Sequence, residues 1–262
     1  ALPISEFMIL GVIQARMNSE RLPGKVLLPI EDKPILWHIH KRLTFSKKLD
    51  KICISTSNNS SNDPIMEFAE KNNVEIFRGS EENLILRHLG AAKLFDANVI
   101  VRITADDPLI DPKIIDDLIS LYEQNPDADF ICNNKERTFP VGLDVEIIPV
   151  KTLKKFEAKS NDSIFYEFFI SNYIFEHPNQ FKSIGMKLDK PLLERWTLDY
   201  PEDYEFIKEI YSHLYKKNSI FLMNDILNLL NKKPSLRRIN LMHYTKFSHL
   251  KYKKLKNSHE KI

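Results

Sequence analysis

Three long cationic side chains follow the first apolar run of the chain within one short stretch. The segment IQARMNSERLPGKVL contains Arg16, Arg21 and Lys25. Pro23 and Gly24 prevent a helix from continuing through this segment, so the three cations do not form the solvated face of a helix. Guanidinium and ammonium groups delivered from one loop favour the oxygens of a polyphosphate. The segment therefore predicts a phosphate-binding loop. It matches neither G-x-x-x-x-G-K-[ST] nor G-x-G-x-x-G, so it is not a Walker A loop or a dinucleotide fingerprint.

A pair of carboxylates follows a later apolar run. Asp106 and Asp107 stand directly after residues 99–104, in the sequence ADDPLIDP. Carboxylate oxygens are hard ligands that suit Mg²⁺. A cationic loop on one wall and these acids on the other would together hold a polyphosphate with a bound divalent metal ion.

Alternating strand and helix patterns must position these groups. Apolar runs rich in β-branched residues predict strands at 9–15, 52–56, 74–77, 99–104 and 130–132. Apolar residues at helical spacing begin after four suitable helix starts, at Pro34, Pro64, Glu81–Glu82 and Pro112. This alternation predicts an α/β fold with a mostly parallel sheet and helices on both faces.

The order of the strands decides whether the loop and the acids meet. In the common doubly wound order 3-2-1-4, the first and fourth strands are neighbours, and ligands bind at their carboxyl ends. The first expected strand leads into the cationic loop, and the fourth leads into Asp106 and Asp107. We therefore expect the two groups to face each other across one cavity.

The pattern changes beyond residue 140. The segments LDVEIIPV and FKSIGMKL predict strands, and SIFYEFFISNYIFEH predicts an aromatic-rich helix between them. We interpret residues 140–192 as a small aromatic-rich excursion from the sheet. It would serve as a lid or a homodimer contact, or simply as a second small core layer. RWTLD then predicts another strand, PEDYEFIKEIYSHLYK a helix, and residues 220–231 a further helix.

Length and composition fit one domain over residues 8–243. We interpret residues 1–7 as a cloning remnant before Met8, and residues 244–262 as a lysine-rich solvated tail. The net charge of +2 argues against a nucleic-acid partner, because such proteins usually carry a marked basic excess.

The expected compartment is the cytoplasm. No apolar run reaches the length of a membrane span and no signal peptide is visible, so no membrane partner is expected. Cys53 and Cys132 lie far apart in apolar stretches. Buried, reduced thiols are expected at both positions.

The segment IQARMNSERLPGKVL resembles the signature of the SpsF-like cytidylyltransferases of spore coat polysaccharide biosynthesis. This group is related to the KDO and acylneuraminate cytidylyltransferases. Further matches are STSNNSSNDP, FRGSEENLILR, VRITADDPLIDP, FPVGLDVE and RWTLDYPED, and together they cover about residues 9–210. The resemblance implies a Rossmann-like, GT-A-like nucleotidyltransferase fold. It also implies transfer of CMP from CTP to a sugar, sugar acid or sugar phosphate, with release of pyrophosphate, for surface polysaccharide or glycoconjugate synthesis.

The resemblance assigns roles to individual residues. Arg16, Arg21 and Lys25 match the phosphate-binding loop, and Asp106 and Asp199 match two aspartates that bind Mg²⁺ (or Mn²⁺). The three cations and Asp106 are the expected catalytic residues. Asp199 has an alternative role, because it could cap the helix that begins after it.

Other residues are expected to contact the nucleotide. Gln14 and Ala15 would read the base through backbone groups, and Ser80 would add a hydroxyl. Arg16, Lys25 and Asp106 would contact its phosphates. Arg78 would bind the nucleotide or pair with an acid.

The acceptor side is marked by acids. Asp144 and Glu146 lie on one face of an expected strand after a glycine turn, and either could instead pair with Arg195. A carboxylated acceptor would also need a cation, which Arg195 or Arg137 would supply. Acids without additional cations favour attack by a hydroxyl over attack by a phosphate.

Two other functions remain open. A GT-A-type glycosyltransferase that uses a nucleotide sugar would bind its metal ion with Asp106 and Asp107, but it would have little need for the cationic loop. A non-catalytic nucleotide-binding module is suggested by departures from the family pattern at Leu86 and Phe168–Phe169.

Overall fold

The computed structural model describes residues 7–157, 170–217 and 219–246. The expected remnant therefore lies almost wholly outside the described residues, as does most of the lysine-rich tail. Phe168–Phe169 and the first half of the expected aromatic-rich helix also lie outside them.

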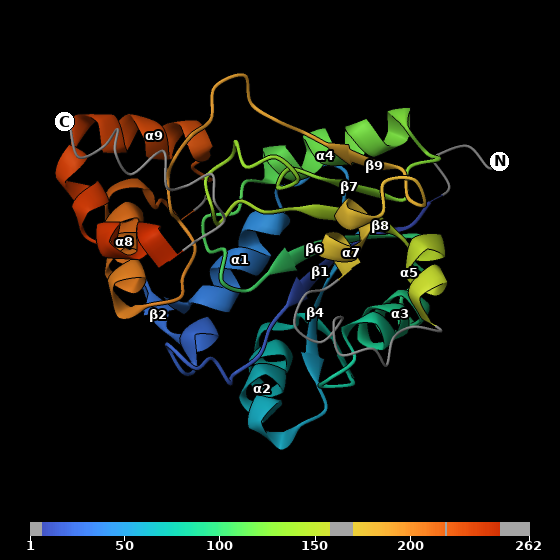
Figure 1. Ribbon diagram of the computed structural model, residues 1–262. Helices are drawn as coiled ribbons and strands as arrows, with labels where there is room; N and C mark the ends of the chain where they lie inside the picture. The colour runs from blue at the N-terminus through green and yellow to red at the C-terminus, as the bar shows by residue number, and fades with distance from the viewer. Residues whose placement is uncertain (1–6, 158–169, 218, 247–262) are drawn as a thin grey trace.

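The central element is a sheet in which the described residues contribute seven strands, in the order β5-β4-β1-β6-β8-β7-β9 (Figure 1). Strands β5, β4, β1 and β6 are parallel and realise the expected order 3-2-1-4. The bounds are β1 Ile9–Gln14, β4 Lys51–Ser57, β5 Glu75–Gly79, β6 Val99–Thr104, β7 Phe130–Cys132, β8 Glu146–Pro149 and β9 Ser183–Gly185. The five strands expected before residue 140 are thus confirmed, with small shifts at their ends.

Helices cover both faces of the sheet, as expected. Alternate residues of β1 divide between two cores, with Ile9 and Ile13 in one and Leu10 and Val12 in the other. The first core is closed by α1 Ile35–Leu43, α2 Asp63–Asn72, α4 Pro112–Gln124, α8 Pro201–Leu214 and α9 Met223–Lys232. The second is closed by α3 Leu84–Leu94, α5 Val150–Glu157 and α7 Ile170–Glu176. Figure 1 shows α8 and α9 on the opposite side of the view from α3 and α5.

The block from residue 140 to 192 contributes strands to the sheet itself. Strand β8 runs antiparallel between β6 and β7, and β9 pairs with β7. Ile147 and Ile148 point into opposite cores, so β8 is buried on both faces like a central strand. The interpretation of these two strands as an excursion was therefore wrong.

The strand expected over RWTLD was also wrong. Only Arg195 forms a β-bridge, and its partner is Val141. Gly142 has φ 105°, and a Cβ there would lie 2.5 Å from the backbone nitrogen of Thr197. The Leu198 N–H donates instead to the Asp106 carbonyl in the loop after β6, so the segment does not extend a ladder.

Cys53 and Cys132 are both buried free thiols, as expected. Burial raises the pKa of each to about 12. Among the described helices, none combines the length and apolar character needed to cross a bilayer.

Candidate active site

The cationic loop after β1 is shaped by Gly24. Its φ of 69° is left-handed, a conformation that glycine adopts without strain. The Gly24 N–H donates to the carbonyl of Met17 at 3.0 Å, which turns the chain back toward the sheet. A short 3₁₀ helix, Lys25–Leu27, follows and buries Val26. The side chain of Lys25 is thereby directed inward, and the residue is only 8% exposed.

The loop after β6 is joined to the segment before α8. The Leu198 N–H donates to the carbonyl of Asp106 at 2.7 Å, and the Thr197 hydroxyl donates to the same carbonyl at 3.1 Å. These bonds bring Asp199 to the carboxyl ends of β1 and β6, although it lies far along the chain.

Lys25 is the centre of the resulting cluster. Its Nζ donates to the Leu198 carbonyl at 2.6 Å, to Asp199 Oδ1 at 3.0 Å and to Asp106 Oδ2 at 3.2 Å. Arg21 Nη2 lies 2.8 Å from the same Asp199 oxygen. Two cations of the loop therefore meet the two aspartates for which the sequence proposed a metal-binding role.

The electrostatics of the cluster keep these groups charged. Burial alone would lower the pKa of Lys25, but Asp106 and Asp199 outweigh it and raise the pKa above its ordinary value. Burial alone would raise the pKa of Asp106, but Lys25 and a hydrogen bond from Thr104 lower it. The pKa of Asp107 moves the other way, because burial and the nearby Asp106 and Asp144 carboxylates raise it.

A cavity of about 520 Å³ opens beside this cluster. That volume falls within the usual range for small-molecule and cofactor sites. The cavity is lined by seven residues singled out from the sequence, which are Gln14, Ala15, Arg16, Arg21, Lys25, Asp106 and Asp199. It is also lined by residues that the sequence reasoning missed, among them Ser57, Leu84, Arg87, Arg102 and Thr104.

Two of the missed residues had a recognisable signal. Arg87 interrupts the apolar segment LILRHLGAA, and Arg102 interrupts the apolar strand VIVRIT. A charged residue inside an apolar run is unusual unless it has a partner or a function.

Arg78 and Ser80 do not appear among the residues that line the cavity. Arg78 lies 2.8 Å from Asp63 and donates to the carbonyls of Ser57 and Asn59. The Ser80 hydroxyl accepts a hydrogen bond from the Asn83 N–H at the start of α3. Both side chains therefore hold local turns.

The acids expected on the acceptor side already have cationic partners. Arg137 pairs with Asp144, and Arg102 Nη1 lies 2.7 Å from Glu146 Oε2. Neither acid pairs with Arg195, whose Nη2 lies 2.6 Å from Asp203 and 3.4 Å from Asp199. Arg195 is 1% exposed and does not appear among the residues that line the cavity.

Asp203 takes the capping role that was an alternative for Asp199. Its Oδ2 accepts hydrogen bonds from the backbone N–H groups of Asp199 and Tyr200, both at 3.0 Å. The carboxylate of Asp199 is thus left to Lys25, Arg21 and Arg195.

The donor set around Lys25 fits a hard divalent cation. One ammonium contacts both Asp106 and Asp199, so a single cation is within reach of both carboxylates. Across the described part of the chain, no group of three His, Cys, Asp or Glu side chains gathers as a metal site. A metal ion held here would therefore take its remaining oxygen ligands from substrate and water.

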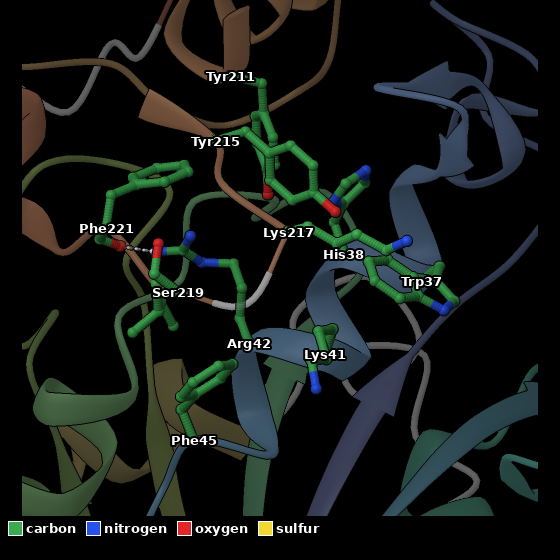
Figure 2. A pocket seen from close by; sticks show the side chains of 11 residues that line it. Trp37, His38, Lys41, Arg42, Phe45, Tyr211, Tyr215, Lys217, Ser219 and Phe221 are labelled. Atoms are coloured by element: carbon green, nitrogen blue, oxygen red, sulfur yellow. Dashed lines mark hydrogen bonds between the residues drawn. The ribbon is translucent and has the colours of Figure 1, made fainter. Parts of the chain in front are cut away.

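A second cavity is too small for a nucleotide. It measures about 20 Å³, which is roughly the space that one water molecule needs. Arg42 reaches across it from α1 and donates to the Phe221 carbonyl at 2.7 Å (Figure 2). Trp37, Tyr211 and Tyr215 surround it with aromatic rings. The cavity beside Lys25 is therefore the candidate active site.

A doubly wound sheet whose cavity lies at the carboxyl ends of β1 and β6 is typical of nucleotide-binding α/β proteins. The family model described as "Cytidylyltransferase" matches residues 10–232. The chain belongs to this cytidylyltransferase family, as the resemblance implied.

Two relatives support this assignment, one along most of the chain and one along less than half of it. The spore coat polysaccharide biosynthesis protein SpsF of Bacillus subtilis is 30% identical over 86% of this chain and 95% of its own length. An 8-amino-3,8-dideoxy-manno-octulosonate cytidylyltransferase of Shewanella frigidimarina is 34% identical over 44% of this chain and 47% of its own.

Solved structures show the same fold. A cytidylyltransferase from Leptospira borgpetersenii is 36% identical, with a TM-score of 0.83 over 88% of this chain and 97% of that one. The CMP:2-keto-3-deoxy-manno-octonic acid synthetase complexed with CTP has a TM-score of 0.59 at 14% identity, over 78% of this chain and 98% of that one. The second likeness concerns the fold alone.

Proposed function

We propose that this cytidylyltransferase transfers CMP from CTP to a sugar-type acceptor for surface polysaccharide or glycoconjugate synthesis. The observation that carries the proposal is the contact of Lys25 with both Asp106 and Asp199 beside the cavity. A phosphate oxygen of the acceptor, or a hydroxyl oxygen that gives up its proton to a carboxylate, attacks the α-phosphorus of CTP and forms a new P–O bond. The bond to the leaving pyrophosphate breaks and takes its electron pair to the pyrophosphate oxygen.

The residues of the loop act by position and charge. Lys25 and Arg16 hold the phosphate oxygens on which negative charge accumulates, and Arg21 holds the outer phosphates. Because phosphoryl transfer needs little covalent participation by the protein, placement and neutralisation of charge account for most of the catalysis. Mg²⁺ or Mn²⁺ bound by Asp106 and Asp199 would add positive charge at the phosphate oxygens.

The nucleoside and the acceptor share the one cavity in this proposal. Gln14 and Ala15 line the cavity and are proposed to contact the nucleoside. On the acceptor side, Asp144 is half-buried and remains a candidate contact, whereas Glu146 is 4% exposed and acts by holding Arg102.

The proposed compartment is the cytoplasm. Two buried free thiols suit a reducing cytoplasm. A homodimer that forms through residues 140–192 stays a proposal, and light scattering after size-exclusion chromatography would test it.

The decisive experiment has two steps. Thermal unfolding with each of the four nucleoside triphosphates, with and without Mg²⁺ or Mn²⁺, should show the largest stabilisation by CTP with metal ion, because a ligand of the folded state raises the Tm. Sugar acids and sugar phosphates are then tested with CTP for pyrophosphate release, which EDTA should abolish. If the protein released no pyrophosphate from CTP but released free nucleotide from a nucleotide sugar, it would instead be a glycosyltransferase.

A further inference from the structure

Three arginines gather at the part of the cavity that faces α3. Arg16, Arg87 and Arg102 all line it. Arg87 extends from α3 and is 5% exposed. Its Nη1 donates to the Ser80 carbonyl at 3.1 Å, and its Nε is buried with no hydrogen-bond partner among the described residues. A buried guanidinium in this state bears a desolvation penalty that a bound anion would relieve.

The three guanidiniums repel one another. Burial, with the nearby charges of Arg102 and Arg16, lowers the pKa of Arg87 to about 10, and Glu81 opposes this shift. This environment differs from that of Lys25, whose pKa is raised by two carboxylates in direct contact. One cavity therefore has a region in which acids balance the cations and a second region with a surplus of positive charge.

Arg102 is fixed within the second region. Its Nε donates to Gln14 Oε1 at 2.9 Å, and its Nη1 donates to Glu146 Oε2 at 2.7 Å. Side chains two residues apart on a strand share one face of the sheet. Val12, Ile100 and Ile148 pack in the core beneath α3 and α5, and the face that they define also carries Gln14, Arg102 and Glu146. Val26, next to Lys25, packs in the core on the other face. The two cationic regions thus lie toward different faces of the sheet.

We propose that Arg87, together with Arg102, binds an anionic group of the acceptor, a carboxylate or a phosphate, while Arg16 stays with the phosphates of CTP. The proposal rests on the proposed function, in which the loop around Lys25 takes the triphosphate of CTP. A planar guanidinium donates to two oxygens of one carboxylate or phosphate, which gives both strength and orientation. The acceptor is accordingly a sugar acid or sugar phosphate rather than a neutral sugar, and Arg87 determines that specificity.

The test uses inorganic phosphate as the probe of this subsite. The Tm of the full chain, saturated with CTP and Mg²⁺, is followed while phosphate is added at constant ionic strength. Wild-type protein should be stabilised in a saturable manner. R87Q should require about tenfold more phosphate for the same increase in Tm, because it loses a charged hydrogen-bonding contact with the anion. R238Q removes an exposed arginine that does not line the cavity, so it should behave as wild type.

The nucleotide provides the second arm. The affinity of R87Q for CTP should stay within about threefold of wild type. A tenfold loss of CTP affinity would assign Arg87 to the nucleotide and overturn the proposal. An unchanged phosphate response in R87Q, or no saturable response in wild type, would overturn it as well. Failure of CTP to stabilise wild-type protein is a separate result, which contradicts the proposed function.

A measurement on wild-type protein covers the case in which R87Q does not fold. The Nε–Hε resonance of Arg87, assigned by its loss in R87K, should shift as phosphate is added to the CTP-saturated protein. A resonance that does not move at saturating phosphate would refute binding at this subsite.

Discussion

Lys25 Nζ lies 3.0 Å from Asp199 Oδ1, although 174 positions separate the two residues in the sequence. The same ammonium also contacts Asp106, which follows β6. A single buried cation therefore joins the loop after β1 to two later parts of the chain, and substitutions here report on catalysis and on stability together.

Replacing Lys25 with methionine should impair both properties. K25M should slow pyrophosphate release by about 10²–10³-fold, by analogy with the loss of other charge-stabilising donors. It should also lower the free energy of unfolding by about 2–3 kcal/mol, because two carboxylates lose their shared cation. Urea denaturation and a pyrophosphate assay provide the two measurements. The control K113M removes a lysine from an exposed pair with Asp117 and should change stability by less than about 1 kcal/mol. Wild-type stability and rate in K25M would contradict the assignment.

Asp106→Asn should abolish turnover and leave the fold intact. The amide keeps the size of the side chain but loses the negative charge that a divalent metal ion needs. We expect the rate to fall at least about 10²-fold with either Mg²⁺ or Mn²⁺, with an unchanged far-ultraviolet circular dichroism spectrum. D117N, which neutralises an exposed carboxylate outside the cavity, should retain the wild-type rate. Full metal-dependent activity in D106N would remove Asp106 from the site.

The pH dependence of stability should reveal Asp107. Burial, followed by the charges of Asp106 and Asp144, raises its pKa above the ordinary 3.8. The native state then binds this proton more tightly than the unfolded state does, so its stabilising contribution is lost as pH rises from about 4 through the raised pKa. D107N removes this titration. Its Tm should exceed that of wild type at pH 7, and the difference should shrink toward pH 4. A D107N protein that is less stable than wild type at pH 7 would show that the carboxylate is favourably ionised.

Arg195→Met should act on stability. Its guanidinium contacts Asp203 and Asp199, and Asp203 is fully buried. An unpaired charge at Asp203 should lower the free energy of unfolding by about 3–5 kcal/mol. In the double variant R195M/D203L both charges are absent, so part of this loss should be recovered in urea denaturation. A stable R195M enzyme with an increased KM for the acceptor alone would instead place Arg195 in the acceptor site.

Local sequence signals were sufficient for the first half of the fold. The runs that form β1, β4, β5 and β6 are apolar and β-branched, and prolines or acids mark the helix starts between them. The neighbouring positions of β1 and β6 followed from the common doubly wound order 3-2-1-4. The convergence of the cationic loop with Asp106 depended on that order.

The second half depended on contacts that no local pattern specifies. Strand β8 inserts antiparallel between β6 and β7, which is a matter of long-range pairing. The apolar residues around Leu198 resemble a strand in the sequence. In the structure, the Leu198 N–H donates to the loop after β6, a long-range contact that the local pattern does not reveal. The pairing of Asp144 with Arg137 could not be read from spacing, and the roles assigned to individual site residues stay predictions.

The last strand that the structure describes ends at Gly185, yet Asp199 and the helix that orients it come later. A shortened chain that stops after β9 would keep each of the described strands and still lose one wall of the cavity. Because α8 and α9 also close the first core, a truncation in this region would reduce both activity and stability. The carboxyl-terminal third thus completes the candidate active site and the hydrophobic core together.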